Sequence, residues 1–139
     1  MGILSDFFIG EKDTIPTYDG GDDFASEDRC QLKSITPLEA AGILEALTGR
    51  DTLEALDDFT LLTPQDAEDW TMSVPDEMVE ALAALNDSRL ADVAKRCSDI
   101  TAEELHWTPG DFLSTISELR GLARRAVDEN KTLYLWNSL

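Results

Sequence analysis

Histidine, cysteine and glycine are scarce in this sequence, which narrows the chemistry that the chain can perform. There are one His, two Cys and eight Gly among 139 residues. Zinc sites draw on several His and Cys ligands, and phosphate-binding loops need clustered glycines. The sequence also contains no G-x-S-x-G, P-loop, G-x-G-x-x-G or H-E-x-x-H motif. We therefore predict no catalytic residue from motifs, no metal site and no cofactor.

Basic residues are few as well. Eleven Lys and Arg stand against 29 Asp and Glu, which gives a formal net charge of −18. Nucleic-acid binders neutralise phosphates with Lys and Arg, and proteins that dock on anionic membranes need the same residues. We therefore expect neither direct nucleic-acid binding nor attachment to a membrane.

Long apolar runs are missing too. No stretch approaches the roughly 18 apolar residues of a membrane-spanning helix. The first ten residues have no basic segment, and Ser5 and Asp6 interrupt their apolar stretch, so they do not fit a secretory signal. We interpret this start as an apolar turn packed against the core, formed by Ile3, Leu4, Phe7 and Phe8. A soluble cytoplasmic protein is the expectation.

The two cysteines, Cys30 and Cys97, are far apart in the sequence and have no neighbouring His. The sequence leaves a disulfide between them open, but without an export signal reduced thiols are the default. Cys97 falls on the apolar face of a predicted helix, so we interpret it as a small core residue. Cys30 receives the same interpretation at the start of a predicted strand.

The length and the patterning favour a single domain over residues 1–139. Residues 11–29 are polar, rich in turn-forming residues and without periodicity, which predicts a long acidic loop. A helix-start phrase follows three times, in Thr36-Pro-Leu-Glu39, Thr63-Pro-Gln-Asp66 and Thr108-Pro-Gly-Asp111. Thr can cap the helix, Pro fits the first helical position, and the acid suits the positive helix end. Thr101-Ala-Glu-Glu104 repeats the capping box without Pro.

Apolar residues at helical spacing predict a mainly helical fold. The helices are expected to carry Leu38–Leu47, Leu53–Phe59, Met78–Leu85 and Leu90–Cys97, with a long last helix over Pro109–Glu129. Strand-forming residues occupy Cys30–Ile35, Trp70–Val74 and Thr132–Asn137. The predicted fold is α+β, with about five or six helices packed on one small sheet of two or three strands. A helical bundle with extended arms is the alternative.

The charge is unevenly distributed. Residues 1–88 hold 21 of the 29 acidic residues and only 4 of the 11 basic ones. One acidic cluster lies in the loop, at Asp19, Asp22, Asp23, Glu27 and Asp28, and lacks the ligand spacing of a calcium loop. The candidate binding cluster lies in the middle of the chain, at Asp57, Asp58, Asp66, Glu68, Asp69 and Trp70. Carboxylates beside an aromatic side chain favour a basic protein as the partner. Our first hypothesis is therefore a small, non-enzymatic interaction module. Immunity proteins and nucleic-acid mimics are proteins of this physical class.

Two other hypotheses stay open. The first is a hydrolytic enzyme, because paired carboxylates can catalyse hydrolysis. In such an enzyme the one histidine, His106, could act as a general base oriented by Glu103. Alternatively, a hydrophobic surface could make the chain a homo-oligomeric module. The one basic cluster, Arg120, Arg124 and Arg125, is expected to pair with the chain's own acids, Glu118, Asp128 and Glu129.

Overall fold

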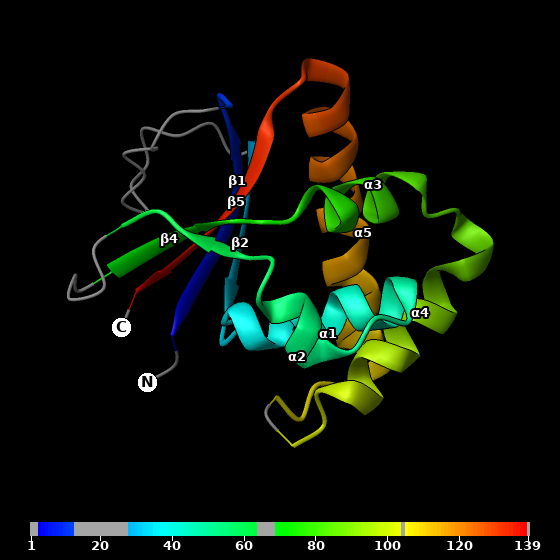
Figure 1. The fold of residues 1–139 in the computed structure, drawn as a ribbon. Coiled ribbons are helices and arrows are strands. Elements are labelled where there is room, and N and C mark those ends of the chain that lie inside the picture. Colours follow the sequence, from blue (N-terminus) through cyan, green and yellow to red (C-terminus); the bar gives the residue numbers. More distant parts are fainter. Residues whose placement is uncertain (1–2, 13–27, 64–68, 104, 139) are drawn as a thin grey trace.

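The computed structural model describes residues 3–12, 28–63, 69–103 and 105–138. Within these ranges the chain forms helices and strands in mixed order, with the helices gathered on one side (Figure 1). The strands are β1 (Leu4–Gly10), β2 (Arg29–Lys33), β3 (Thr60–Leu61), β4 (Asp69–Ser73) and β5 (Thr132–Ser138). The helices are α1 (Pro37–Thr48), α2 (Thr52–Leu56), α3 (Asp76–Ala84), α4 (Asp87–Ile100) and α5 (Pro109–Glu129).

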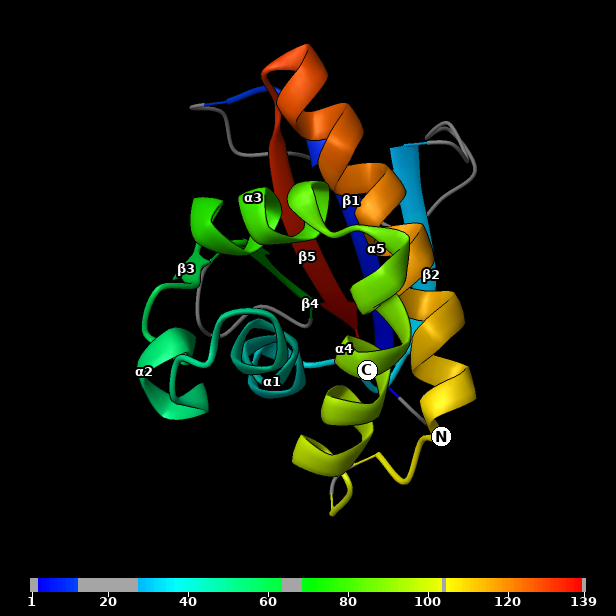
Figure 2. The same cartoon turned by 90° about the vertical axis from the view of Figure 1, so that its right-hand side faces the viewer.

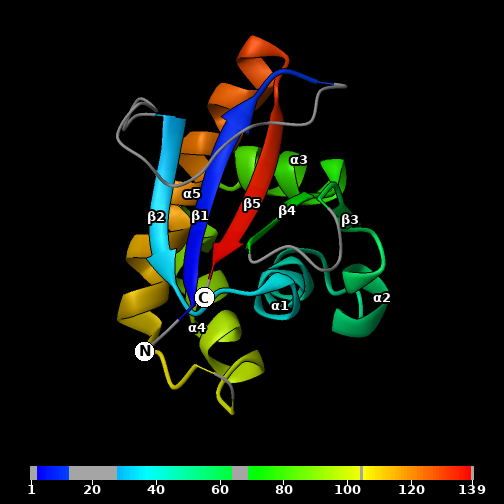
Figure 3. The ribbon, with the colours of Figure 1, turned by 90° about the vertical axis from the view of Figure 1, so that its left-hand side faces the viewer.

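The strands form one antiparallel sheet in the order β2-β1-β5-β4-β3, which Figure 3 shows face on. The prediction of a small sheet of two or three strands is therefore wrong, and so is the helical bundle. The strands expected near Cys30, Trp70 and Thr132 are present, whereas β1 and β3 were not predicted.

The apolar turn predicted at the start of the chain is wrong: Leu4–Gly10 is strand β1, and both of its faces are buried. Phe7 and Ile9 point towards the helices, while Phe8 lies on the opposite face beside Tyr134 and Trp136. A strand that is covered on both faces consists of consecutive apolar residues, so it lacks the alternation of apolar and polar residues by which strands are recognised. The segment Phe7–Ile9 is such a run.

The core lies between the sheet and the helices that cover it (Figure 2). Leu133 and Leu135 of β5 face this layer, and both are fully buried. The helices contribute residues three and four positions apart, as an amphipathic helix requires. Those of α5 are Phe112, Ile116, Leu119 and Ala123. Within the described ranges, no helix has the length and apolarity that a bilayer crossing needs.

Within the described ranges, α1 to α5 lie where the spacing of apolar residues predicts helices. Gly49 ends α1 at φ 83°, a left-handed conformation that glycine adopts without strain. Thr108 and Asp111 form the expected capping box at the start of α5: Asp111 N donates to Thr108 Oγ1 (3.1 Å) and Thr108 N donates to Asp111 Oδ2 (2.9 Å).

The other helix-start phrases behave differently. Thr36 precedes α1 but makes no capping bond with its side chain; its hydroxyl donates to the Glu39 carboxylate instead. Thr101 does not start a helix, because it is the C-terminal cap of α4 and its hydroxyl donates to Cys97 O (2.8 Å). The residues that follow Thr63 in the phrase Thr63-Pro-Gln-Asp66 lie outside the described ranges.

Two glycines give a matched stability test. Gly121 lies on the exposed side of α5, where an added Cβ meets nothing within 4 Å. Gly121→Ala should raise the free energy of unfolding by about 0.5–1 kcal/mol, because alanine restricts the unfolded chain and favours the helix. Gly49→Ala should lower it by about 1 kcal/mol, because its φ is positive. Urea unfolding of both variants measures the difference, and effects of equal sign would contradict this account of α1 and α5.

Candidate functional site

An acidic surface surrounds α2. It consists of Asp51, Glu54, Asp57, Asp58 and Glu77, and we call these five residues the acidic surface. All five are exposed. Asp51 caps α2 by accepting from Leu53 N (3.1 Å) and Glu54 N (3.3 Å).

One cation lies within this surface. The Arg50 guanidinium pairs with Asp58 and, at 3.3 Å, with Glu77, and so ties α2 to the start of α3. The hydrogen bond to Asp58 is the main cause that raises the pKa of Arg50. Among the described residues, neither Glu54 nor Asp57 has an ion pair. The guanidinium thus pairs with two of the five carboxylates, and the surface keeps a net negative charge.

The structure distributes the predicted binding cluster over two places. Asp57 and Asp58 follow α2, directly before β3. Asp69 lies on the face of the sheet away from the helices, where it accepts from Trp136 Nε1 (3.0 Å). Trp70 is half-buried on the helix side of the sheet, in register with Asn137.

The two places are well separated along the sheet. Thr60 of β3 pairs with Ser73, at the opposite end of β4 from Asp69, which is roughly 13 Å along a strand of this length. Asp66 and Glu68 lie outside the described residues, as do Asp19, Asp22, Asp23 and Glu27 of the loop cluster. The binding role of the cluster stays a prediction.

The arginines of α5 hold neighbouring elements together. Arg124 donates to Ala83 O (3.0 Å) and Leu85 O (2.9 Å) at the end of α3. Arg120 donates to Leu85 O (3.3 Å) and pairs with Asp87 at 2.7 Å. These contacts place cations at the negative end of α3, whose last turn has no basic residue of its own.

Arg125 pairs with Glu129, as predicted, and also with Asp28. The other expected acidic partners, Glu118 and Asp128, form no ion pair with these arginines in the described part of the chain; Glu118 accepts from Cys30 Sγ (2.9 Å) instead. The cluster thus has a structural role.

His106 is exposed and adopts φ 55° in the connection between α4 and α5. The described structure contains no hydrogen bond between His106 and Glu103, so the predicted orientation of a general base is not present. The parts of the chain that the structure describes also contain no group of three or more His, Cys, Asp or Glu that could hold a metal ion.

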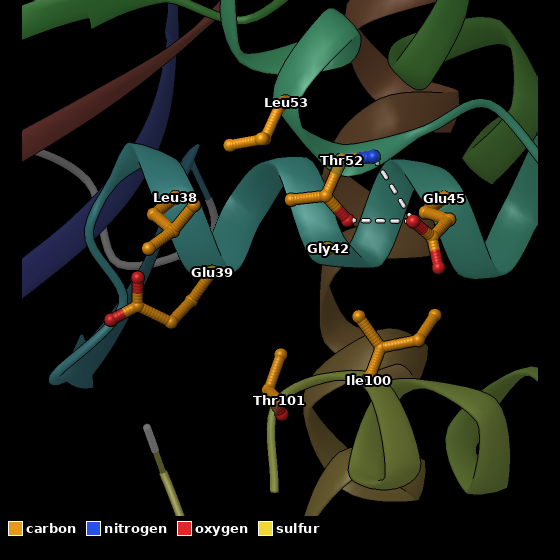
Figure 4. Close-up of a pocket in the computed structure, with 8 residues that line it drawn as sticks. All are labelled: Leu38, Glu39, Gly42, Glu45, Thr52, Leu53, Ile100 and Thr101. Atoms are coloured by element: carbon orange, nitrogen blue, oxygen red, sulfur yellow. Dashed lines mark hydrogen bonds between the residues drawn. The ribbon is translucent and has the colours of Figure 1, made fainter. Parts of the chain in front are cut away.

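A groove runs along α1, bordered by α2 and by the end of α4 (Figure 4). Its volume is about 440 Å³. The lining residues are Leu38, Glu39, Gly42 and Glu45 of α1, Thr52 and Leu53 of α2, and Ile100 and Thr101. Sequence reasoning missed this groove, because it assigned Leu38 and Leu53 to inward-facing stripes, whereas both are exposed, at 38% and 68%.

Other hollows lie elsewhere in the described structure, and two of them are of interest. One, of about 170 Å³, separates α3 from the end of α5 and has Lys12, Lys131, Asp76 and Glu80 on its rim. The other lies between the edge strand β2 and the first turns of α5, and contains Trp107 and Glu118. Neither joins groups of the kind that acid–base catalysis requires, such as a base within hydrogen-bond reach of an oriented partner.

Both cysteines are buried free thiols, as predicted. Burial raises the pKa of Cys97 to about 12, and burial together with the hydrogen bond to Glu118 raises the pKa of Cys30 further. Thiolates are the reactive form of cysteine, so neither side chain is set up as a nucleophile.

This burial predicts how thiol reactivity and stability depend on pH. At pH 8 a thiol reagent should modify neither cysteine until the protein is unfolded. The folded pKa of Cys97 lies above its ordinary value of 9.0, so its contribution to stability is complete below pH 9 and declines as the pH rises towards 12. Urea unfolding at pH 8 and pH 10.5 should show a smaller decline in Cys97→Ala than in the parent chain. Rapid modification of the folded protein would contradict the assignment of both thiols to the core.

Comparison with known proteins gives no relative from which a function could be transferred. No protein-family description, curated protein or solved structure matches the chain. A function has to be inferred from the acidic surface and the groove themselves.

Proposed function

We propose that this protein is an interaction module of the cytoplasm that binds a basic partner protein through the acidic surface around α2. The single observation that supports this is the imbalance of charge there, where five exposed carboxylates surround one guanidinium, that of Arg50. A cationic partner would neutralise the excess, which otherwise destabilises the folded chain by self-repulsion.

The long helices α4 and α5 support the proposal by contrast. Three of their cations have an acidic partner close by: Lys95 pairs with Asp99, Arg120 with Asp87, and Arg125 with Glu129. Paired charges attract a partner only weakly, because their electric fields largely cancel at a distance. The carboxylates of the acidic surface that have no ion pair with a described residue still attract a cationic partner.

Such a surface would act mainly on the rate and selectivity of association. Complementary charge speeds diffusional encounter and rejects partners of like charge, and the effect fades when salt screens the field. Asp51 and Arg50 are fixed by hydrogen bonds within the protein, so part of the surface is already ordered before a partner arrives. Immunity proteins and nucleic-acid mimics are the functional classes that use this physics.

Two triple variants with equal charge changes test the proposal. The first, Asp51→Asn with Glu54→Gln and Asp57→Asn, neutralises the acidic surface, and the asparagine side chain at position 51 can still cap α2. The second, Asp92→Asn with Glu103→Gln and Asp128→Asn, removes the same charge from exposed positions elsewhere. Each immobilised protein is offered its own cell lysate at low salt, and the captured proteins are quantified and identified.

The first triple variant should lose most of the basic proteins that the parent chain captures, whereas the second should keep them. Capture by the parent should also fall steeply between about 20 mM and 300 mM salt, because exposed charges are screened. Equal losses in the two triple variants would mean that the partner senses only net charge, and the α2 surface would then have no special role.

A further inference from the structure

The groove along α1 holds one carboxylate near each end (Figure 4). Glu45 Oε1 accepts from Thr52 N (3.0 Å) and from Thr52 Oγ1 (2.9 Å), and Glu39 Oε2 accepts from the Thr36 hydroxyl. In each carboxylate the second oxygen has no hydrogen bond to any described residue. An ionised carboxylate offers about four acceptor sites, so both groups keep unused capacity.

Glu39 is the more unusual of the two. Only 9% of its surface is exposed, yet its one partner is a neutral hydroxyl. Burying a charged carboxylate is costly unless a cation or several donors compensate it. The eight residues that line the groove include no Lys, Arg or His. The only positive charge that they offer Glu39 is the partial charge at the N-terminal end of α1, in whose first turn it lies.

The middle of the groove is apolar and lacks a side chain where α1 and α4 meet. A Cβ on Gly42 would lie 3.1 Å from Thr101 Cγ2 and 3.3 Å from Ile100 Cγ2, so the glycine lets the end of α4 pack closely against α1. Gly42 and Ile100 thereby line the groove between the two glutamates. Leu38 and Leu53 are exposed on the borders of the groove, and Leu53 is the more exposed of the two. The space between the two carboxylates is therefore suited to an aliphatic chain.

We propose that this groove binds a linear aliphatic dication, an α,ω-diamine or polyamine. The two glutamates are six residues apart in α1, which corresponds to about 9 Å along the helix axis and roughly 120° around it, with Gly42 midway between them. A diamine or polyamine in an extended form that lies across Gly42 would bridge this separation. One ammonium group would donate to the free oxygen of Glu39 and the other to that of Glu45. The methylene chain would cover Gly42 and contact Ile100.

This ligand goes beyond the proposed protein partner, because it needs two fixed carboxylates and an apolar path between them. Binding to the acidic surface depends on the total charge of the ligand. Binding in the groove depends on the distance between the two ammonium groups of the ligand. Diamines of different length and a monoamine therefore separate the two mechanisms.

Calorimetric titration of the full chain with butane-1,4-diamine, hexane-1,6-diamine, spermidine and butylamine tests the proposal. We expect saturable binding of at least one diamine or of spermidine with a stoichiometry of one, and binding of butylamine at least tenfold weaker. Glu39→Gln and Glu45→Gln should each weaken diamine binding about tenfold, the loss expected when a charge-assisted hydrogen bond becomes a neutral one.

Both substitutions keep the acceptor oxygen that the Thr36 hydroxyl or Thr52 uses, and a thermal unfolding curve of each variant shows whether it is folded. Asp128→Asn is the matched control, since it removes one exposed negative charge at the far end of α5. Its diamine affinity should stay within about twofold of the parent value.

Several results would overturn the proposal. Equal affinity for butylamine and the diamines would show that one cation site is enough. Equal losses in Asp128→Asn and Glu45→Gln would reduce the binding to general electrostatics. The triple variant of the acidic surface leaves both groove glutamates in place, so protein capture and diamine binding can fail independently.

Discussion

The pairing of β1 with β5 is the interaction on which the rest of the fold depends. Seven residues of β1 pair with seven of β5, from Leu4 opposite Ser138 to Gly10 opposite Thr132, and more than 120 positions separate them in the chain. Contacts between residues so far apart in the sequence form slowly. The other strands add to this pair, β2 beside β1, and β4 followed by β3 beside β5. The Asn137 amide extends the pairing to the helices, because it donates to Ile35 O (2.9 Å) just before α1 and to Ser5 Oγ (3.2 Å). The position of α1, and with it the groove, thus depends on the centre of the sheet.

The helices could be predicted from the sequence and much of the sheet could not, for a physical reason. The amphipathic pattern of α5, with Phe112, Ile116 and Leu119 on one face, is local, and its capping box lies within four residues. Strand β1 is defined by its neighbours across the sheet, and its burial on both faces removes the alternating pattern. The two-residue strand β3 has no recognisable pattern of its own.

Of the two candidate sites, the acidic surface could be predicted in part from the sequence and the groove could not. The excess of acid around Asp57 and Asp58 can be counted in the sequence, although Glu77 joins them only because Arg50 bridges α2 and α3. The groove could not be predicted, because Glu39 and Glu45 border a common space only after the helices have packed together. Thr52 has to approach from α2, and the end of α4 has to approach Gly42, before the two carboxylates border a common space. The spacing of glutamates along a helix gives no sign of either event.

Some of the few basic side chains of this protein connect its own helices. Arg120 and Arg124 donate to backbone carbonyls at the end of α3, and Arg50 joins two helices, so each of them connects elements that are distant in sequence. The carboxylates at Glu39, Glu45 and Asp51 are held instead by neutral hydroxyl or backbone N–H donors. A neutral donor fixes the position of a carboxylate without cancelling its charge. An acidic chain that uses its cations to connect its own elements therefore retains negative groups that are ordered but have no paired cation among the described residues, which is the condition for recognising a cation from outside.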